Sequence, residues 1–293
     1  MSDLQIRPLQ DSDIPTVVNW ARLEDFAPGI GDITIYRNTD RQGIWLGWQG
    51  DTPVGCIAGV KYNQCFGFIG LYIVQRDFRG HGHGHQLWET ALNHLSDVDC
   101  IGLEAAPKLI DHYGEWGFRS DAKTIRWQLH NRHPEANVQH RADQSGLEVI
   151  RGVNLTMEAV HEYDAKREAT PRHHFLTQWL SHPAGDVMTL MDNAGQCHGF
   201  ARIRPCLLPI AEGWRIGPIL ADSAELARVL LDRLLIDHPG VVLIDSPATN
   251  QSAAMVLSSL GFKQVSATTR MYRGTVKPLH NDAVFGLACL ELG

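Results

Sequence analysis

Arg79-Gly80-His81-Gly82-His83-Gly84 lies between an apolar run, Phe68 to Val74, and a helical pattern. Glycine lets the backbone turn sharply and approach a ligand closely, because it has no side chain to clash. A helix that begins directly after such a turn points unpaired N–H groups and the positive end of its dipole toward it. The stretch therefore predicts a loop that binds a pyrophosphate.

Two common phosphate motifs do not fit this loop. A Walker loop would end in Gly-Lys-Ser/Thr, whereas Gly84 is followed by His85-Gln86. A dinucleotide fingerprint would follow the first strand of its domain, and here the preceding strand is about the fourth. The remaining pattern, Arg-x-x-Gly-x-Gly on Arg79, Gly82 and Gly84, resembles the acyl-CoA loop of the GCN5-related N-acetyltransferases (GNAT).

The resemblance extends beyond the loop. Ile69 to Gly80 is similar to the family's strand and loop nearly position by position, with Arg76 where many members carry proline. Gly102 to Pro107 and His112 to Phe118 resemble the next strand and the following helix end. The resemblance implies an N-acetyltransferase that uses acetyl-CoA as acyl donor.

The resemblance also implies which residues hold the donor. Backbone N–H groups of the loop would bind the pyrophosphate, and main-chain groups near Ile73 and Val74 would pair with the pantetheine arm like an added strand. The loop residues concerned are Arg79, Gly80, His81, Gly82, His83 and Gly84.

Three alternating histidines could instead suggest a metal site. His81, His83 and His85 are loop residues whose side chains need not converge, and no cysteine or carboxylate lies nearby at a matching spacing. We therefore expect no metal site here. We expect His81 and His83 to place partial positive charge near the phosphates.

Acyl transfer to an amine needs a base and an acid. An alkyl amine with a pKa near 10 is only about 0.1% neutral at pH 7, so a base helps considerably. By resemblance, Glu104 is the candidate base and Tyr113 the acid that protonates the departing sulfur. Glu104 could instead be a salt-bridged strand residue, and Tyr113 could simply pack against Trp116 and Phe118.

The segment Glu24 to Gly29 is similar to a Glu-Gly-Trp-Asn-Pro-Gly segment of a bacterial tandem subfamily. It lies where this fold covers its acceptor pocket, so Glu24, Asp25, Phe26 and Asp32 are candidate substrate-binding residues. Phe26 and Ala27 depart from the subfamily pattern, which leaves the acceptor open. A solvated helix end is an equally good interpretation of the carboxylates.

The elements repeat along the chain. We expect an N-terminal catalytic domain over 1–135 and a C-terminal domain over 136–293, with the polar segment 131–146 as linker. The second unit resembles a degenerate GNAT domain, because its junction Gly217 to Ser223 lacks the glycines and carries Asp222, which would repel a phosphate. The predicted fold class is α/β (α+β), with two tandem acyl-CoA N-acyltransferase folds, each a mixed, mostly antiparallel sheet flanked by helices.

Composition is that of an ordinary globular protein. The chain has 293 residues, 44% hydrophobic and 20% charged, and six scattered cysteines without a Cys-x-x-Cys pair. No apolar run is long enough for a membrane span, and Met1 to Leu4 lacks a secretory layout, so we expect a cytoplasmic protein without a membrane partner. A net charge of -7 without a Lys/Arg run predicts no nucleic-acid partner and suits a cationic substrate. A homodimer stays open.

The favoured function is acetyl transfer to a primary amine of a small molecule. The alternative is a catalytically silent sensor that binds acyl-CoA, since intact loop glycines support both. A further alternative is that the second domain only stabilises the first. In that domain Asp245, Asn250, Arg270 and Tyr272 form no recognisable catalytic set, and we expect them to shape the pocket or the contact between the halves.

Overall fold

The computed structural model describes residues 4–132, 146–152, 157–275 and 281–293, and the structural statements below concern these residues. The first half begins with a strand and two helices, β1 (Leu4–Pro8), α1 (Ile14–Leu23) and α2 (Asp32–Thr39). There follow β2 (Ile44–Gln49), β3 (Thr52–Lys61), β4 (Phe66–Val74), α3 (His83–His94), β5 (Cys100–Ala105), α4 (Ile110–Glu115) and β6 (Arg119–Asn131).

The second half repeats this order of elements. It begins with β7 (Glu148–Arg151), α5 (Met157–Ala165) and α6 (His173–Ser181). There follow β8 (Asp186–Met191), β9 (Cys197–Leu207), β10 (Glu212–Ala221), α7 (Ala224–Ile236), β11 (Gly240–Pro247), α8 (Gln251–Ser259) and β12 (Lys263–Gly274). A short strand, β13 (Val284–Gly286), has no counterpart among the described residues of the first half.

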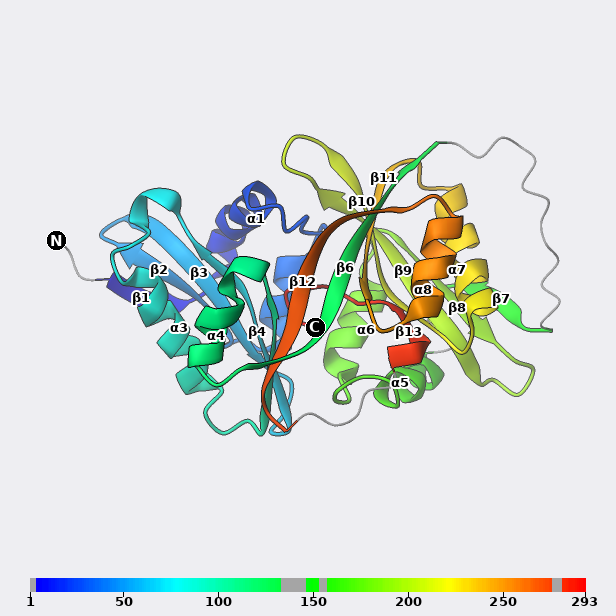
Figure 1. Ribbon diagram of the computed structural model, residues 1–293, viewed down its shortest axis with the longest axis horizontal. Coiled ribbons are helices and arrows are strands. Elements are labelled where there is room, and N and C mark those ends of the chain that lie inside the picture. The colour runs from blue at the N-terminus through cyan, green and yellow to red at the C-terminus, as the bar shows by residue number, and fades with distance from the viewer. Residues whose placement is uncertain (1–3, 133–145, 153–156, 276–280) are drawn as a thin grey trace.

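The strands form one sheet that runs through both halves (Figure 1). Their order is β1-β2-β3-β4-β5-β12-β6-β11-β10-β9-β8-β7, with β13 paired to β10. Only β4 with β5 and β10 with β11 are parallel among the described pairs. The class is therefore the predicted one, a mixed, mostly antiparallel sheet flanked by helices.

The closing strands of the two halves are exchanged. β12, from the second half, pairs with β5 along all of Cys100–Ala105, and β6, from the first half, pairs with β11 along all of Gly240–Pro247. The two exchanged strands also pair with each other at the centre of the sheet. Both neighbours of β6 therefore belong to the second half, because strand partners are selected by packing and not by local periodicity.

The helices give the two halves a shared core. Helix α3 buries Leu87, Trp88 and Ala91 against the first half of the sheet, as its periodicity predicts. On the other side, Tyr36 of α2 stacks on Trp179 of α6, with ring centroids 6.1 Å apart and planes 14° apart. One continuous apolar cluster thus contains residues of both halves.

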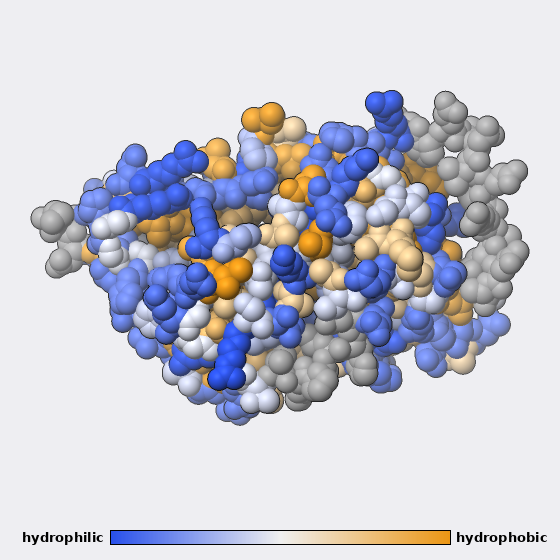
Figure 2. All heavy atoms as spheres, in the orientation of Figure 1, coloured by the Kyte–Doolittle hydropathy of each residue, from blue (hydrophilic) through white to orange (hydrophobic). Residues whose placement is uncertain are grey.

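The surface is that of a globular domain pair. Figure 2 shows hydrophilic residues spread over the viewed face, with apolar residues in smaller groups between them. None of the described helices is long and apolar enough to cross a membrane.

Candidate active site

The glycine loop has the conformation that a phosphate site needs. Gly80 and Gly82 have φ angles of +80° and +82°, and nothing lies within 4 Å of where a Cβ would be at either residue. Gly82 is the N-cap of α3, and no side chain caps this helix end. The first amides of a 12-residue helix therefore point without a side-chain partner into an open turn, which fits a pyrophosphate.

The third glycine has a different role. A Cβ on Gly84 would lie 2.5 Å from the hydroxyl oxygen of Tyr72, so this glycine lets α3 pack closely on β4. Arg79 ties the loop down, because its Nε donates to the carbonyl of Val74 at 2.7 Å and its Nη2 to Glu24 Oε1 at 2.7 Å. His81 is exposed, whereas His83 is buried and its Nδ1 has no partner among the described residues.

Beside the loop, β4 and β5 diverge. They pair in parallel only from Phe66 to Ile69 on β4, and the chain then bends at Leu71, whose φ is +46°. The rest of β4, including Ile73 and Val74, pairs with β3 on one side only. We call this divergence of β4 and β5 the first splay. Its free strand edge can accept a strand-like ligand such as an acyl-CoA arm.

Tyr113 lies on α4 and is buried. Its ring stacks on Trp88, with centroids 5.0 Å apart, so it has the packing role that the sequence left open, and its role as acid remains a prediction. Burial, together with nearby Tyr72, raises the pKa of the Tyr113 phenol. The phenol therefore stays protonated at neutral pH, as a proton donor must.

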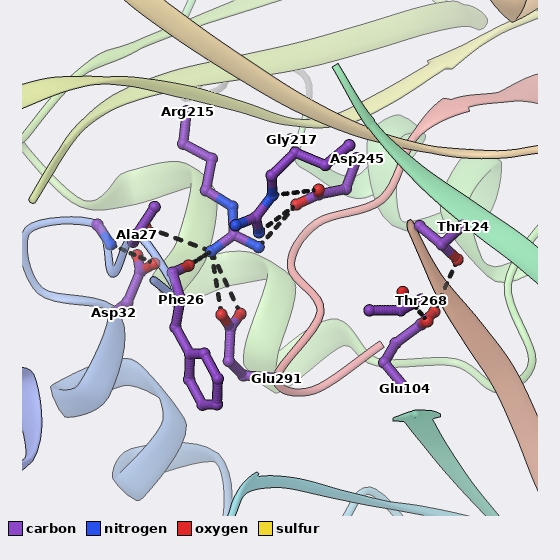
Figure 3. A network of polar contacts seen from close by, with 12 residues as sticks. Phe26, Ala27, Asp32, Glu104, Thr124, Arg215, Gly217, Asp245, Thr268 and Glu291 are labelled. Carbon is purple, nitrogen blue, oxygen red and sulfur yellow. Dashed lines mark hydrogen bonds and ion pairs between the residues drawn. The ribbon is translucent and has the colours of Figure 1, made fainter. Parts of the chain in front are cut away.

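Glu104 is held by three donors, of which Figure 3 shows the hydroxyls of Thr124 and Thr268. The hydroxyls of Thr124 and Thr268 donate to its carboxylate at 2.8 and 2.6 Å, and Nε of Arg270 donates at 2.7 Å. The carboxylate side chain is only 3% exposed. All three donors come from the exchanged strands β6 and β12, so Glu104 belongs to a buried network, and its role as base remains a prediction.

The candidate acceptor residues do not converge on one open pocket. Asp25 is exposed, and Glu24 is paired with Arg79. Asp32 is fully buried, and its carboxylate accepts from Arg204 of β9 at 2.9 Å and from the backbone N–H of Gly29 at 2.9 Å. Although burial acts to raise it, the Arg204 guanidinium holds the pKa of Asp32 below its usual value.

The loop around Phe26 docks on the second half. The carbonyls of Asp25 and Phe26 accept from Arg126 and Arg215 at 3.0 and 3.1 Å. The Phe26 side chain is half-buried at the edge of the shared core. The segment expected to cover an acceptor pocket is thus held by Arg215 of the second half and by Arg126 of the exchanged strand β6.

A buried charge cluster lies beside this loop, and sequence reasoning did not identify it as a unit. Arg215 bridges Asp245 at 2.9 Å and Glu291 at 3.1 Å, as Figure 3 shows. Asp245 also binds Arg126 at 2.7 Å, and although burial acts to raise it, the two guanidinium groups lower the pKa of Asp245 to about 2. An arginine in an otherwise apolar strand was the available signal, because a buried charge needs a partner.

Comparisons with known proteins show which family both halves of the chain resemble. Residues 9–131 match the model of the acetyltransferase (GNAT) family, and residues 160–286 match that of an acetyltransferase (GNAT) domain. Holothin acyltransferase of Pseudoalteromonas sp. (strain SANK 73390) is 28% identical over 290 residues, which is 98% of this chain and 94% of the relative.

Solved structures share the fold over the whole chain. A putative acetyltransferase from Pyrococcus horikoshii superposes with a TM-score of 0.82 at 23% identity, covering 100% of this chain and 97% of that one. A tandem GNAT protein from the clavulanic acid biosynthesis pathway has a TM-score of 0.64 at 14% identity, covering 94% and 99%. With two family models matched in sequence and the same double fold in space, this chain belongs to the GNAT superfamily of acyltransferases and carries two GNAT domains in tandem.

Proposed function

We propose that the protein transfers an acetyl group from acetyl-CoA to a primary amine of a small molecule, and that the reaction takes place in the first domain, over 1–135. The observation that carries this proposal is the uncapped start of α3 behind Gly80 and Gly82, next to the free edge of β4. These features supply the two contacts that an acyl-CoA needs, one for its phosphates and one for its arm.

The chemistry is an exchange of bonds at the thioester carbon. The amine nitrogen forms a C–N bond, the C–S bond breaks, the amine loses a proton and the departing thiolate gains one. Tyr113 is the proposed donor of that last proton, because its phenol is protonated at neutral pH. Glu104 would take the amine proton directly or through water, and its contact with Arg270 would then have to loosen.

The acceptor is best sought among cationic amines. Asp25 is exposed and accessible to such a ligand, whereas Glu24 is paired with Arg79 and Asp32 with Arg204. A relative that spans nearly the whole chain is named for acyl transfer to holothin, so holothin belongs in any panel of acceptors. Polyamines, amino acids, aminoglycosides and peptide amines complete it.

A silent acyl-CoA sensor is the second candidate. It is favoured by one observation, the saturation of Glu104 by three donors, because a carboxylate so bound is a poor acceptor for a further proton. In the sensor, CoA affinity would be retained without turnover.

Release of free CoA thiol over the amine panel, with mass spectrometry of the products, separates the two candidates. We expect thiol release with at least one amine, and Gly82→Asp should abolish it because a carboxylate would face the phosphates. Gly82→Asn is the matched control, with the same shape and no charge. Tight binding of acetyl-CoA without thiol release from any amine would favour the sensor.

A further inference from the structure

The second half has a splay of its own. β10 and β11 pair in parallel only from Trp214 to Ile216 on β10, as β4 and β5 do up to Ile69. Both strands continue with a glycine, Gly217 in the second half and Gly70 in the first, and both show a register shift against the neighbouring strand near this point. We call the divergence of β10 and β11 the second splay.

The second splay is occupied by the chain itself. β13 pairs antiparallel with β10 at Ile219 and Leu220, the positions that correspond to Tyr72 and Ile73 of β4. On the other side, the backbone N–H of Leu287 donates to the carbonyl of Asp245 on β11 at 2.8 Å. The segment 284–287 thus contacts both β10 and β11 and fills the second splay. In the first splay, no described strand pairs with the edge of β4 that faces β5.

Packing keeps β13 in place. Val284, Phe285 and Gly286 are all buried. A Cβ on Gly286 would lie 3.3 Å from side-chain atoms of both Ile219 and Ile244, so any larger residue would force these side chains to move. The occupied splay is therefore a packed part of the core and not a surface contact.

The phosphate end of the second splay is closed as well. Ser223 caps α7 by accepting from the N–H of Leu226 at 3.3 Å, so one of the donors that α3 leaves free is used here. Asp222 precedes the cap and accepts from Tyr163 at 2.7 Å and from Arg167. A carboxylate stands where the first half has its glycine loop, which disfavours an incoming phosphate.

From β13 the chain crosses to the first half. A Cβ on Gly217 would lie 2.1 Å from the carbonyl oxygen of Leu287. A Cβ on Gly70 would lie 1.9 Å from the carbonyl oxygen of Glu291, so the chain passes too close to both residues for any side chain there. The hydroxyl of Tyr62 donates to the carbonyl of Leu292 at 3.3 Å. We call residues 287–293 the tail. The tail therefore runs from the second splay at Gly217 to the first splay at Gly70, the glycine in the equivalent position.

We propose that β13 is a built-in substitute for the acyl-CoA arm in the second domain, and that this domain thereby anchors the tail against β4 as a wall of the acceptor site. The proposal rests on the proposed function for its view of the first splay as the acyl-CoA site. It makes the second domain a fixed support for the acceptor side, with one acyl-CoA bound per chain.

The first test is stoichiometry and amide protection on the full chain. Calorimetry with acetyl-CoA should give one site, and Gly82→Asp should leave none. Amides 284–287 should exchange slowly with hydrogen isotope, equally with and without saturating acetyl-CoA. A second site, binding that survives in Gly82→Asp, or loss of protection at 284–287 on adding acetyl-CoA would overturn the proposal.

The second test displaces β13. Gly286→Val should raise the KM for the amine at least tenfold and leave acetyl-CoA affinity within twofold, because the proposal places the tail at the acceptor side and not at the glycine loop. Met255→Val, at an exposed position of α8 in the same half, is the control. Unchanged KM with accelerated exchange at 284–287 would refute the wall. A wild type that bound no acetyl-CoA would contradict the proposed function alone. Slow exchange of amides 284–287 in the wild type would still show whether β13 fills the second splay.

Discussion

Replacing Asp32 by asparagine separates a structural role from an acceptor-binding role. The carboxylate and its partner Arg204 are both fully buried, and three N–O contacts of 2.9, 3.1 and 2.9 Å join them. The variant keeps the shape of the side chain and removes only the charge. Arg204 is then left in the core without its counterion.

The size of the effect follows from the burial of the pair. Removing one partner of a buried ion pair costs about 3–5 kcal/mol, because the remaining charge is neither solvated nor neutralised. For a chain of this length, 1 kcal/mol corresponds to about 2 °C in Tm, so the variant should unfold about 6–10 °C below the wild type. The double variant Asp32→Asn with Arg204→Met should recover more than half of this loss.

Differential scanning calorimetry measures the loss, and the steady-state KM for the amine is determined in parallel. We expect lower Tm with KM changed less than threefold at temperatures where the variant is folded. A Tm within 2 °C of the wild type, or a KM raised tenfold or more at full stability, would refute the structural assignment and restore Asp32 as an acceptor residue.

The remaining predictions concern the acid, the base and the buried charges. Tyr113→Phe should lower kcat about 100-fold or more and leave acetyl-CoA affinity unchanged; wild-type turnover would exclude the acid role. Glu104→Gln should lower kcat/KM most at pH 7 and least near pH 10, where the amine is neutral by itself, and an equal loss at every pH would contradict the base role. The pKa of Asp245 lies below its unfolded value of 3.8, so its roughly 2 kcal/mol of stability is complete above pH 4 and lost as pH falls toward 2; chemical unfolding at pH 6, 4 and 3 checks this, and Asp245→Asn should flatten the slope.

Elements with local signals could be predicted from the sequence. α1, Ile14–Leu23, is such an element, because Asp13 and a proline in the first turn are local signals for a helix start. The glycine loop and the apolar face of α3 are also local features. The fold and superfamily followed from these because the motif blocks occur in order along the chain.

Partners distant in sequence could not be predicted. Glu104 is held by Thr124, Thr268 and Arg270, the last of which is 166 residues away. By register, Asp245 occupies the position of Glu104 in the second half, and it binds Arg126, the counterpart of Arg270. Such pairs depend on which strand lies beside which, and β6 and β12 carry similar alternating patterns that fit either half.

The exchange of β6 and β12 also bears on how a nascent chain matures on the ribosome. β5 is completed at Ala105, but its neighbour begins only at Lys263, more than 150 residues later. At about 5–20 residues per second of synthesis, the backbone groups on that edge of β5 wait roughly ten to thirty seconds for a partner. An unpaired strand edge invites intermolecular association, so premature termination between these points should yield aggregates that chaperones must hold.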